Sequence, residues 1–300
     1  MTELETLNAD FAKPGVSFEP GPGLLNTVLL HHDGACARLC THGAHVLSYV
    51  PRGQSDALWL SPQAVFSPGK AIRGGIPICW PWFSDHRDDP HLPAHGFART
   101  AQWTLIESSS NEGAKTVELT LADDANTRSM WPSPFQLNYR VSLSEAFRAA
   151  LSVTNTGRET MRFTEALHSY FSVLDITQAS LSGLGGYDYL DKVDGFRCKL
   201  QSESALRFRA ETDRIYLDAE GDCAIDDKRG ERRIRIQKTG SRSTVVWNPW
   251  STRARELADF PDTGYTGMLC VESANAGVEV IELAPGASHT LSVCIESAID

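Results

Sequence analysis

The chain has 300 residues, 41% hydrophobic and 22% charged, and no run approaches the roughly 18 apolar residues of a membrane span. Its formal net charge of -10 disfavours nucleic acid or an acidic membrane as a partner, because phosphate backbones are bound through a basic field. The seven cysteines occur singly, which favours reduced thiols over disulfides or a metal site. The first residues are acidic and polar, unlike a signal peptide, so we expect a cytoplasmic protein.

Apolar residues alternate with polar ones in several runs, which is typical of strands with one buried face. The clearest runs span residues 117–121, 137–143 and 291–295. Turn residues such as Asn155-Thr156-Gly157 separate these runs. The pattern predicts an all-β fold with large antiparallel sheets, arranged as a sandwich.

The chain shows no internal repeat, low-complexity tract or linker. We therefore expect residues 1–300 to form a single domain, with residues 1–20 as a loosely ordered N-terminal segment. Only residues 61–66 and 253–258 suggest short helical turns. We also expect the protein to be a monomer.

The segment from Lys70 to Thr100 concentrates candidate binding residues. Arg73 stands directly before Gly74-Gly75, and glycines let the backbone come close to a ligand. Farther along, His95 and Arg99 lie on either side of Gly96. In an acidic protein an anionic small molecule needs a local cluster of arginines, so these two arginines and the imidazole are candidates to bind one anion.

A loop within this segment carries four residues of types that bind metal ions, His86, Asp88, Asp89 and His91. Their spacing matches no recognised ligand pattern, so a solvated loop is favoured over a metal site. The chain also lacks Gly-x-Gly-x-x-Gly and Walker sequences. Neither a dinucleotide nor a nucleotide site is indicated.

Two polar residues in predicted strands have a structural and a functional interpretation. His168 shares a strand face with Ala166 and Tyr170, and a lone histidine in a strand is more often structural than catalytic. Asp213 precedes Arg214, and a salt bridge or turn involving these neighbours is its simpler explanation.

The charged run from Asp226 to Lys238 resembles a nucleic-acid patch at first sight. Gly230 stands at a turn position, however, and Ile234 and Ile236 alternate with arginines. A solvated hairpin is the better interpretation.

Two features near the C-terminus remain open on the local pattern alone. Trp247 and Trp250 surround a turn, where indoles either pack in the core or cover the apolar face of a sugar. Glu272 ends the apolar run 268–271, and a carboxylate there either points to solvent or lies buried with a partner.

Six separated blocks, in the same order along the chain, resemble the glucose-6-phosphate 1-epimerases. These are the hexose-6-phosphate mutarotases of the aldose 1-epimerase superfamily, and the resemblance runs from about Gly43 to the C-terminus. The fold that it implies is a galactose-mutarotase-like β-supersandwich. The blocks span residues 71–77, 93–99, 166–171, 212–216, 247–250 and 270–272.

The resemblance also implies roles for residues of this chain. His168 would be the general acid and Glu272 the general base, and Asp213 would bind a sugar hydroxyl. Arg73 and Arg99 match positions that hold the phosphate and polar groups of the substrate, and we place His95 with them. Some family members have Gln where this chain has Ala94, so one substrate contact is expected to be missing.

The expected reaction exchanges the α and β anomers of a hexose 6-phosphate, and the expected substrate is D-glucose 6-phosphate. Glu272 as carboxylate would take the proton of the anomeric hydroxyl while His168 as imidazolium protonates the ring oxygen. The ring opens, the aldehyde end rotates and the ring closes on the other face. The expected reaction requires neither a metal nor an organic cofactor.

Two alternatives stay open at this level. One is an aldose 1-epimerase for unphosphorylated sugars, and the other is a non-catalytic protein that binds a sugar phosphate. The presence of His168 with Glu272 speaks against the second. Arg73 with Arg99 speaks against the first, although arginine also binds hydroxyl groups.

Overall fold

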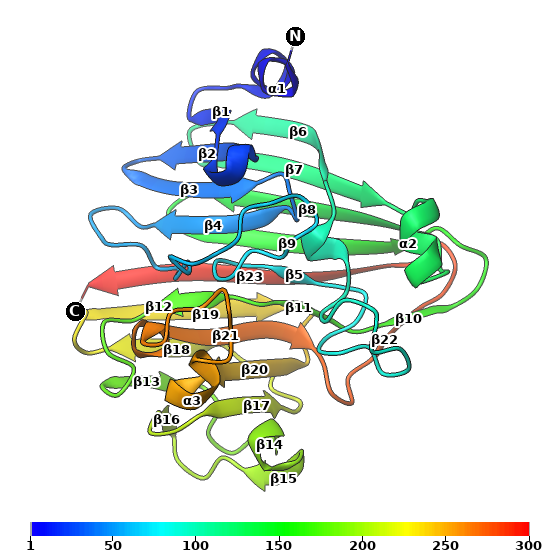
Figure 1. Cartoon of the computed structure of the whole chain (residues 1–300). Coiled ribbons are helices and arrows are strands. Elements are labelled where there is room, and N and C mark those ends of the chain that lie inside the picture. The colour runs from blue at the N-terminus through cyan, green and yellow to red at the C-terminus, as the bar shows by residue number, and fades with distance from the viewer. Residues whose placement is uncertain (1, 300) are drawn as a thin grey trace.

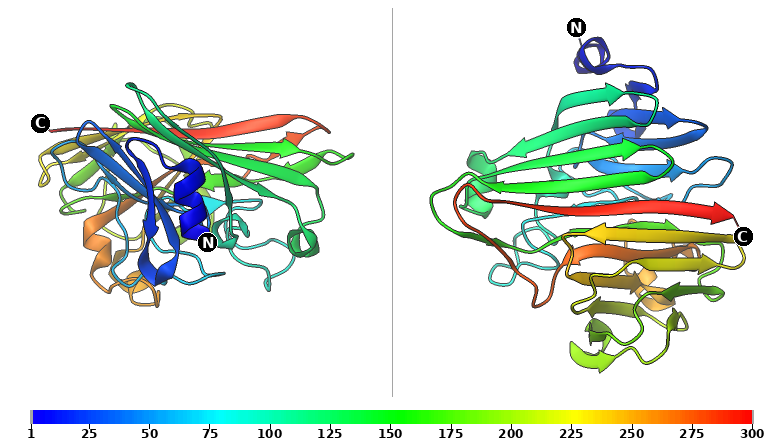
Figure 2. Two further views of the ribbon diagram at one scale, coloured as in Figure 1. Left: turned by 90° about the horizontal axis from the view of Figure 1, so that it is seen from above. Right: turned by 180° about the vertical axis from the view of Figure 1, so that it is seen from behind.

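Two layers of antiparallel strands face each other in the computed structural model, which describes residues 2–299 (Figure 1). The back layer is one nine-stranded sheet, and its long central strand β23 is visible in red from behind (Figure 2). In sheet order its strands are β16 (Ala205–Arg207), β13 (Ala179–Ser182), β18 (Cys223–Asp227), β19 (Arg232–Thr239), β23 (Ser288–Ile299), β9 (Phe147–Asn155), β8 (Phe135–Leu143), β7 (Lys115–Ala122) and β6 (Thr104–Ser110).

The front layer consists of a four-stranded and an eight-stranded sheet, joined by a bridge between Val46 and Ile76. The four-stranded sheet contains β1 (Val16–Pro20), β2 (Asn26–His32), β3 (Ala35–Cys40) and β4 (His45–Val50). The eight-stranded sheet contains, in order, β15 (Arg197–Leu200), β14 (Asp188–Asp191), β17 (Thr212–Tyr216), β20 (Ser243–Asn248), β21 (Met268–Asn275), β11 (Glu165–Leu167) and β5 (Ile78–Cys79), and β12 (Tyr170–Ser172) also pairs with β21. A separate pair joins β10 (Met161–Phe163) to β22 (Ile281–Leu283).

The core lies between the two layers, as the alternation predicts. In β8 the side chains of Phe135, Leu137, Tyr139, Val141 and Leu143 are all buried, and the residues between them are not. Burial of each large apolar side chain stabilises the fold by about 1.5–3 kcal/mol. The five buried side chains of β8 therefore fix which face of this strand packs against the core. The predicted antiparallel sheets are confirmed.

Short helices connect or cover the strands. They are α1 (Glu3–Phe11), α2 (Ala125–Met130) and α3 (Trp250–Ala254), with single turns of 3₁₀ helix η1 (Pro22–Leu24), η2 (Ala98–Thr100), η3 (Lys192–Asp194) and η4 (Gly264–Gly267). Within residues 2–299 no helix has the length and apolar character needed to cross a bilayer.

The N-terminal segment differs from the expected loose order. Residues 3–11 form α1 and residues 16–20 form a strand paired with β2. A capping box begins the helix, because the Thr2 side chain accepts from the Glu5 backbone N–H and the Glu5 carboxylate accepts from the Thr2 N–H. Asn8 then donates to the backbone of Phe18, which fastens the helix to β1.

Two local predictions can be compared with the structure directly. The hairpin over residues 226–238 is confirmed, since Arg233 and Arg235 point outward to Asp226 and Asp222 at 3.0 and 2.9 Å. The helical turn over 61–66 is wrong, because this stretch contains a turn without helix. Helix α3 begins at Trp250, three residues before the predicted 253–258 segment.

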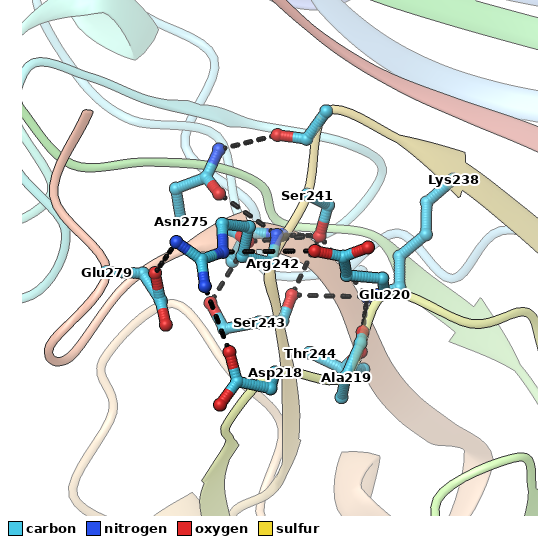
Figure 3. Close-up of polar contacts among 12 residues, drawn as sticks. Asp218, Ala219, Glu220, Lys238, Ser241, Arg242, Ser243, Thr244, Asn275 and Glu279 are labelled. Carbon is cyan, nitrogen blue, oxygen red and sulfur yellow. Dashed lines mark hydrogen bonds and ion pairs between the residues drawn. The ribbon is translucent and has the colours of Figure 1, made fainter. Parts of the chain in front are cut away.

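A polar network fixes the turn between β19 and β20 (Figure 3). The guanidinium of Arg242 contacts Asp218 at 3.1 Å and Glu279 at 3.3 Å, which joins the turn to the segments after β17 and β21. In the same network the ammonium of Lys238, a residue only 8% exposed, donates to the Ala219 and Ser243 carbonyls and to the Ser241 hydroxyl. Burial lowers the pKa of Lys238 to about 8.

The buried lysine should make the stability of the protein depend on alkaline pH. Lys238 titrates at about pH 8 when folded and at 10.5 when unfolded, so holding its charged form is costly below pH 8 and the cost vanishes as the pH rises to 10.5. We expect the free energy of unfolding of the wild type, relative to Lys238→Met, to rise by about 3 kcal/mol at most over this range. Urea unfolding of both proteins at several pH values measures the difference, and a constant difference would contradict the prediction.

Candidate active site

A cavity of about 310 Å³ opens on the face of the eight-stranded sheet that is turned away from the core. All six residues selected from the sequence line it: Arg73, His95, Arg99, His168, Asp213 and Glu272. They come from segments up to 199 positions apart in the chain, between Arg73 and Glu272. The fold therefore gathers the separated blocks at one place.

Strand register explains why these side chains meet. Ala166 pairs with Ala274 and Tyr170 pairs with Cys270, so His168, at the break between β11 and β12, lies opposite Glu272. On the other side of β21, Val245 pairs with Glu272 and Trp247 with Cys270, and Asp213 pairs with Trp247. Since every second side chain of a strand points to the same face, two adjacent rows across the sheet form the cavity floor.

The acid and base candidates are in direct contact. The Nε2 atom of His168 lies 3.4 Å from Oε1 of Glu272, and their side chains are 9% and 1% exposed. Glu272 lies inside β21 and is buried, so the solvent-exposed strand-end alternative is wrong. Within residues 2–299, Nδ1 of His168 and Oε2 of Glu272 have no hydrogen-bond partner, which is unusual for buried polar atoms.

Arg73 is held at the cavity wall by its neighbours. Its Nε and Nη2 atoms each lie 3.1 Å from Oδ1 of Asp259, and its Nη1 donates to the Tyr170 hydroxyl at 3.2 Å. The following glycines serve the backbone rather than a ligand. Gly74 and Gly75 have φ of 103° and 64°, and a Cβ on Gly75 would lie 2.0 Å from the Val46 carbonyl oxygen.

His95 and Arg99 present nitrogen donors from the same loop. The Ser84 N–H donates to Nδ1 of His95 at 3.2 Å, which leaves the imidazole proton on Nε2 as a donor. Nη2 of Arg99 donates to the Ala94 carbonyl at 2.6 Å, whereas its buried Nε has no partner among the described residues. Of the two candidate anion-binding arginines, Arg99 thus has fewer hydrogen bonds to the rest of the protein than Arg73 has.

Asp213 pairs with a residue that the sequence did not indicate. Its Oδ2 lies 3.0 Å from Nζ of Lys192 in η3. The simpler explanation, a salt bridge to the neighbouring Arg214, is wrong because adjacent residues of β17 point to opposite faces. Lys192 lines the cavity as well, but nothing in its local sequence distinguishes it from other surface lysines.

Aromatic rings form part of the cavity wall. His168 stacks on Tyr170 with ring centroids 4.7 Å apart and an interplanar angle of 8°, and Trp247 meets His168 edge-on at 6.2 Å. Of the two indoles singled out earlier, Trp247 lines the cavity and Trp250 packs on Tyr265 instead.

The histidine and aspartate loop of residues 86–91 is arranged as a local turn. Nδ1 of His86 accepts from the backbone N–H groups of Asp88 and Asp89. Across residues 2–299, no three side chains of types that bind metals are grouped to hold an ion.

Comparison with known proteins adds a family to this geometry. Residues 26–296 match the family described as aldose 1-epimerase. This chain belongs to the aldose 1-epimerase family. It is therefore an epimerase, an enzyme of the isomerase class, and its substrate is a small sugar.

Individual relatives of this aldose 1-epimerase agree in fold and length. A protein of Escherichia coli K12 provisionally named glucose-6-phosphate 1-epimerase is 37% identical over 256 residues, 84% of each chain. The crystal structure of a provisionally named mutarotase from Salmonella typhimurium is 30% identical, with a TM-score of 0.90 over 100% of both chains. A galactose mutarotase related enzyme from Lactobacillus acidophilus, 14% identical, superimposes with a TM-score of 0.72 over 90% of this chain and 96% of its own. The expected galactose-mutarotase-like fold is confirmed.

Electrostatics in this aldose 1-epimerase favour uncharged forms of the facing pair. Burial, followed by Arg99 and Arg73, holds the pKa of His168 well below its usual value. Burial, with Asp213, holds the pKa of Glu272 well above its usual value, and Lys192 and Arg99 oppose this shift. Both shifts favour a neutral imidazole beside a protonated carboxyl group, in contrast to the imidazolium and carboxylate of the expected reaction.

Proposed function

We propose that this aldose 1-epimerase interconverts the α and β anomers of a hexose 6-phosphate, with D-glucose 6-phosphate as the preferred substrate. The observation that carries the proposal is the contact between His168 and Glu272 in a cavity that also contains Arg73 and Arg99. A proton-transfer pair and a cationic wall are the two parts that this reaction requires. The names of the relatives support the same substrate.

The pair would catalyse ring opening and closure by proton transfer. Glu272 takes the proton of the anomeric hydroxyl and His168 gives a proton to the ring oxygen, so the bond between C1 and the ring oxygen breaks and C1 becomes an aldehyde. Rotation about the bond between C1 and C2 presents the other face of the aldehyde. Closure returns both protons, and no atom changes its oxidation state, so two titratable side chains suffice.

Substrate binding would supply the charged forms that this step uses. The neutral pair and the ion pair hold the same single proton, on Glu272 in one case and on His168 in the other. Arg99 and Arg73 both disfavour the imidazolium. Arg73 acts on the pKa of His168 and is not among the causes given for Glu272, so a phosphate dianion beside Arg73 would favour transfer of the proton from Glu272 to His168, whereas beside Arg99 it would act on both groups.

Asp213 and His95 would orient the sugar between these groups. Lys192 contacts Oδ2 of Asp213, which leaves Oδ1 free to accept from a sugar hydroxyl. His95 can donate from Nε2. Fixing the sugar at these points allows the C1 end to move while the phosphate end stays in place.

The specificity for a phosphorylated substrate separates this proposal from an epimerase for free sugars. Arg99 has no carboxylate partner among residues 2–299, so it is available to an anion.

A cytoplasmic location and a monomeric state stay predictions.

Anomer exchange followed by NMR tests the proposed function. We expect the protein to accelerate α/β exchange of glucose 6-phosphate well above the rate in buffer, and to accelerate exchange of free glucose far less. Exchange at the buffer rate in the presence of folded protein would contradict catalysis. Equal efficiency with free glucose would instead favour a general aldose 1-epimerase.

A further inference from the structure

A second cleft, of about 690 Å³, is lined by residues of β14, β15, β16 and β17 and of the segments beside them. These strands lie at the end of the sandwich far from α1 (Figure 1). It is lined by residues 200–207 and by Tyr189, Arg209 and Arg214, and it shares no lining residue with the candidate active site. Asp213 and Arg214 are adjacent on β17 and point to opposite faces, so the strand itself separates the two cavities.

Arg214 gives the cleft a fixed positive charge. Its guanidinium carbon lies 4.4 Å from the centroid of the Tyr189 ring, and its Nη1 donates to Oε1 of Gln201 at 3.1 Å and to the Tyr216 hydroxyl at 3.3 Å. Gln201 and Tyr216 are 3% and 0% exposed, so the support for the arginine is rigid. All of these partners are neutral, and the half-buried charge has no carboxylate within 4 Å in the part of the chain that is described.

Arg207 and Arg209 add two further cations to the same cleft. Both are exposed, and neither has an ion-pair partner among residues 2–299. The contrast with the neighbouring hairpin is clear, since Arg233 and Arg235 each pair with an aspartate. Three arginines without counter-ions in one concave site of a protein with net charge -10 favour an anionic ligand.

We propose that this cleft is a second anion site, which binds the phosphate groups of a phosphorylated small molecule. The hydroxyls of Ser202 and Ser204 offer further donors, and the rim residue Leu200, 60% exposed, offers apolar surface to the organic part. Glu203 is the one carboxylate of the lining, and it lies 3.2 Å from Nε2 of Gln201 rather than beside an arginine. The acidic field of the whole protein disfavours a nucleic acid as the occupant.

Calorimetric titration with inorganic pyrophosphate tests the second site. We expect the wild type to bind two equivalents, because the candidate active site also takes phosphate. Arg99→Ala should lose the equivalent bound in the active site and keep the other. The variant Arg207→Gln/Arg209→Gln/Arg214→Gln should keep the active-site equivalent and bind the second at least about tenfold more weakly.

Matched variants separate a site from a general effect of charge. A control with Arg52, Arg148 and Arg158 all changed to Gln removes the same charge from exposed arginines elsewhere on the chain. Equal weakening in the control, or a single equivalent in the wild type that Arg99→Ala abolishes, would overturn the proposal. Arg207→Gln/Arg209→Gln leaves the packing of Arg214 intact and provides the same test if the triple variant fails to fold.

The second site and the proposed function can fail independently. Anomer exchange of glucose 6-phosphate without pyrophosphate should be unchanged in Arg207→Gln/Arg209→Gln, because neither side chain lines the candidate active site. Loss of exchange in this folded variant would place the two arginines in the active site instead of in a separate one. Absence of exchange in the wild type would contradict the function and leave the binding result interpretable.

Discussion

Replacement of Glu272 by Gln is expected to lower kcat for anomer exchange by about two to four orders of magnitude, the range typical of general acid and base groups. Glutamine has nearly the same shape but cannot accept the proton of the anomeric hydroxyl. It also suits a buried site whose carboxyl group already favours the neutral form. The fold and the affinity for substrate should therefore survive, and steady-state rates by NMR give the comparison.

Glu211→Gln provides a control for this variant, because Glu211 lines the same cavity without contacting His168. We expect its kcat to stay within a few-fold of the wild type. Near-normal turnover in folded Glu272→Gln would show that the base lies elsewhere. Asp213 and Glu165 would then be the carboxylates to change next, although Glu165 is 0% exposed and pairs with His289 at 2.9 Å, outside the cavity lining.

The variant Arg99→Ala is expected to bind glucose 6-phosphate with an affinity lower by about one to two orders of magnitude. A hydrogen bond to a charged group contributes about 1.5–3 kcal/mol to binding. Within the protein Arg99 donates to the Ala94 carbonyl, so its other donors can bind the phosphate. Exchange of free glucose should change far less. Arg99→Lys should recover only part of the affinity, because one ammonium cannot give two-pronged contact.

Two further arginines of the cavity sharpen this experiment. Arg253 is 51% exposed and pairs with Glu256 at 2.6 Å, so Arg253→Ala should have a small effect on either substrate. Arg73→Ala should harm both substrates, since it also leaves Asp259 without its partner. If Arg99→Ala weakened the phosphorylated and the free sugar equally, Arg99 would not be the phosphate ligand.

The fold was predictable where one strand face is buried. Residues such as Phe135 and Leu137 alternate with polar neighbours, and this periodicity follows directly from strand geometry. Helix α1 was missed because it is too short to show a clear helical period, although Thr2 and Glu5 are spaced for a capping box. Residues 61–66 were misjudged because a few apolar positions fit a turn as well as a helix.

The candidate site could be predicted in part for a different reason. The blocks around His168 and Glu272 were recognisable as family motifs, whereas their meeting depends on the register of β21, which no local pattern contains. Lys192 and Asp259 could not be found, because each acts through a partner distant in the sequence. The protonation of the pair was also beyond the sequence, since it depends on burial.

The placement of the candidate base on a period-two strand constrains how this enzyme can vary. In β21 Glu272 faces the cavity while Leu269 and Val271 face the core, and deletion or insertion of one residue would exchange the two faces. The carboxylate would then enter the apolar core and an aliphatic side chain would enter the cavity. Strand β21 can thus accept changes of side chain but not of length, and variation in length belongs to exposed turns such as residues 111–114.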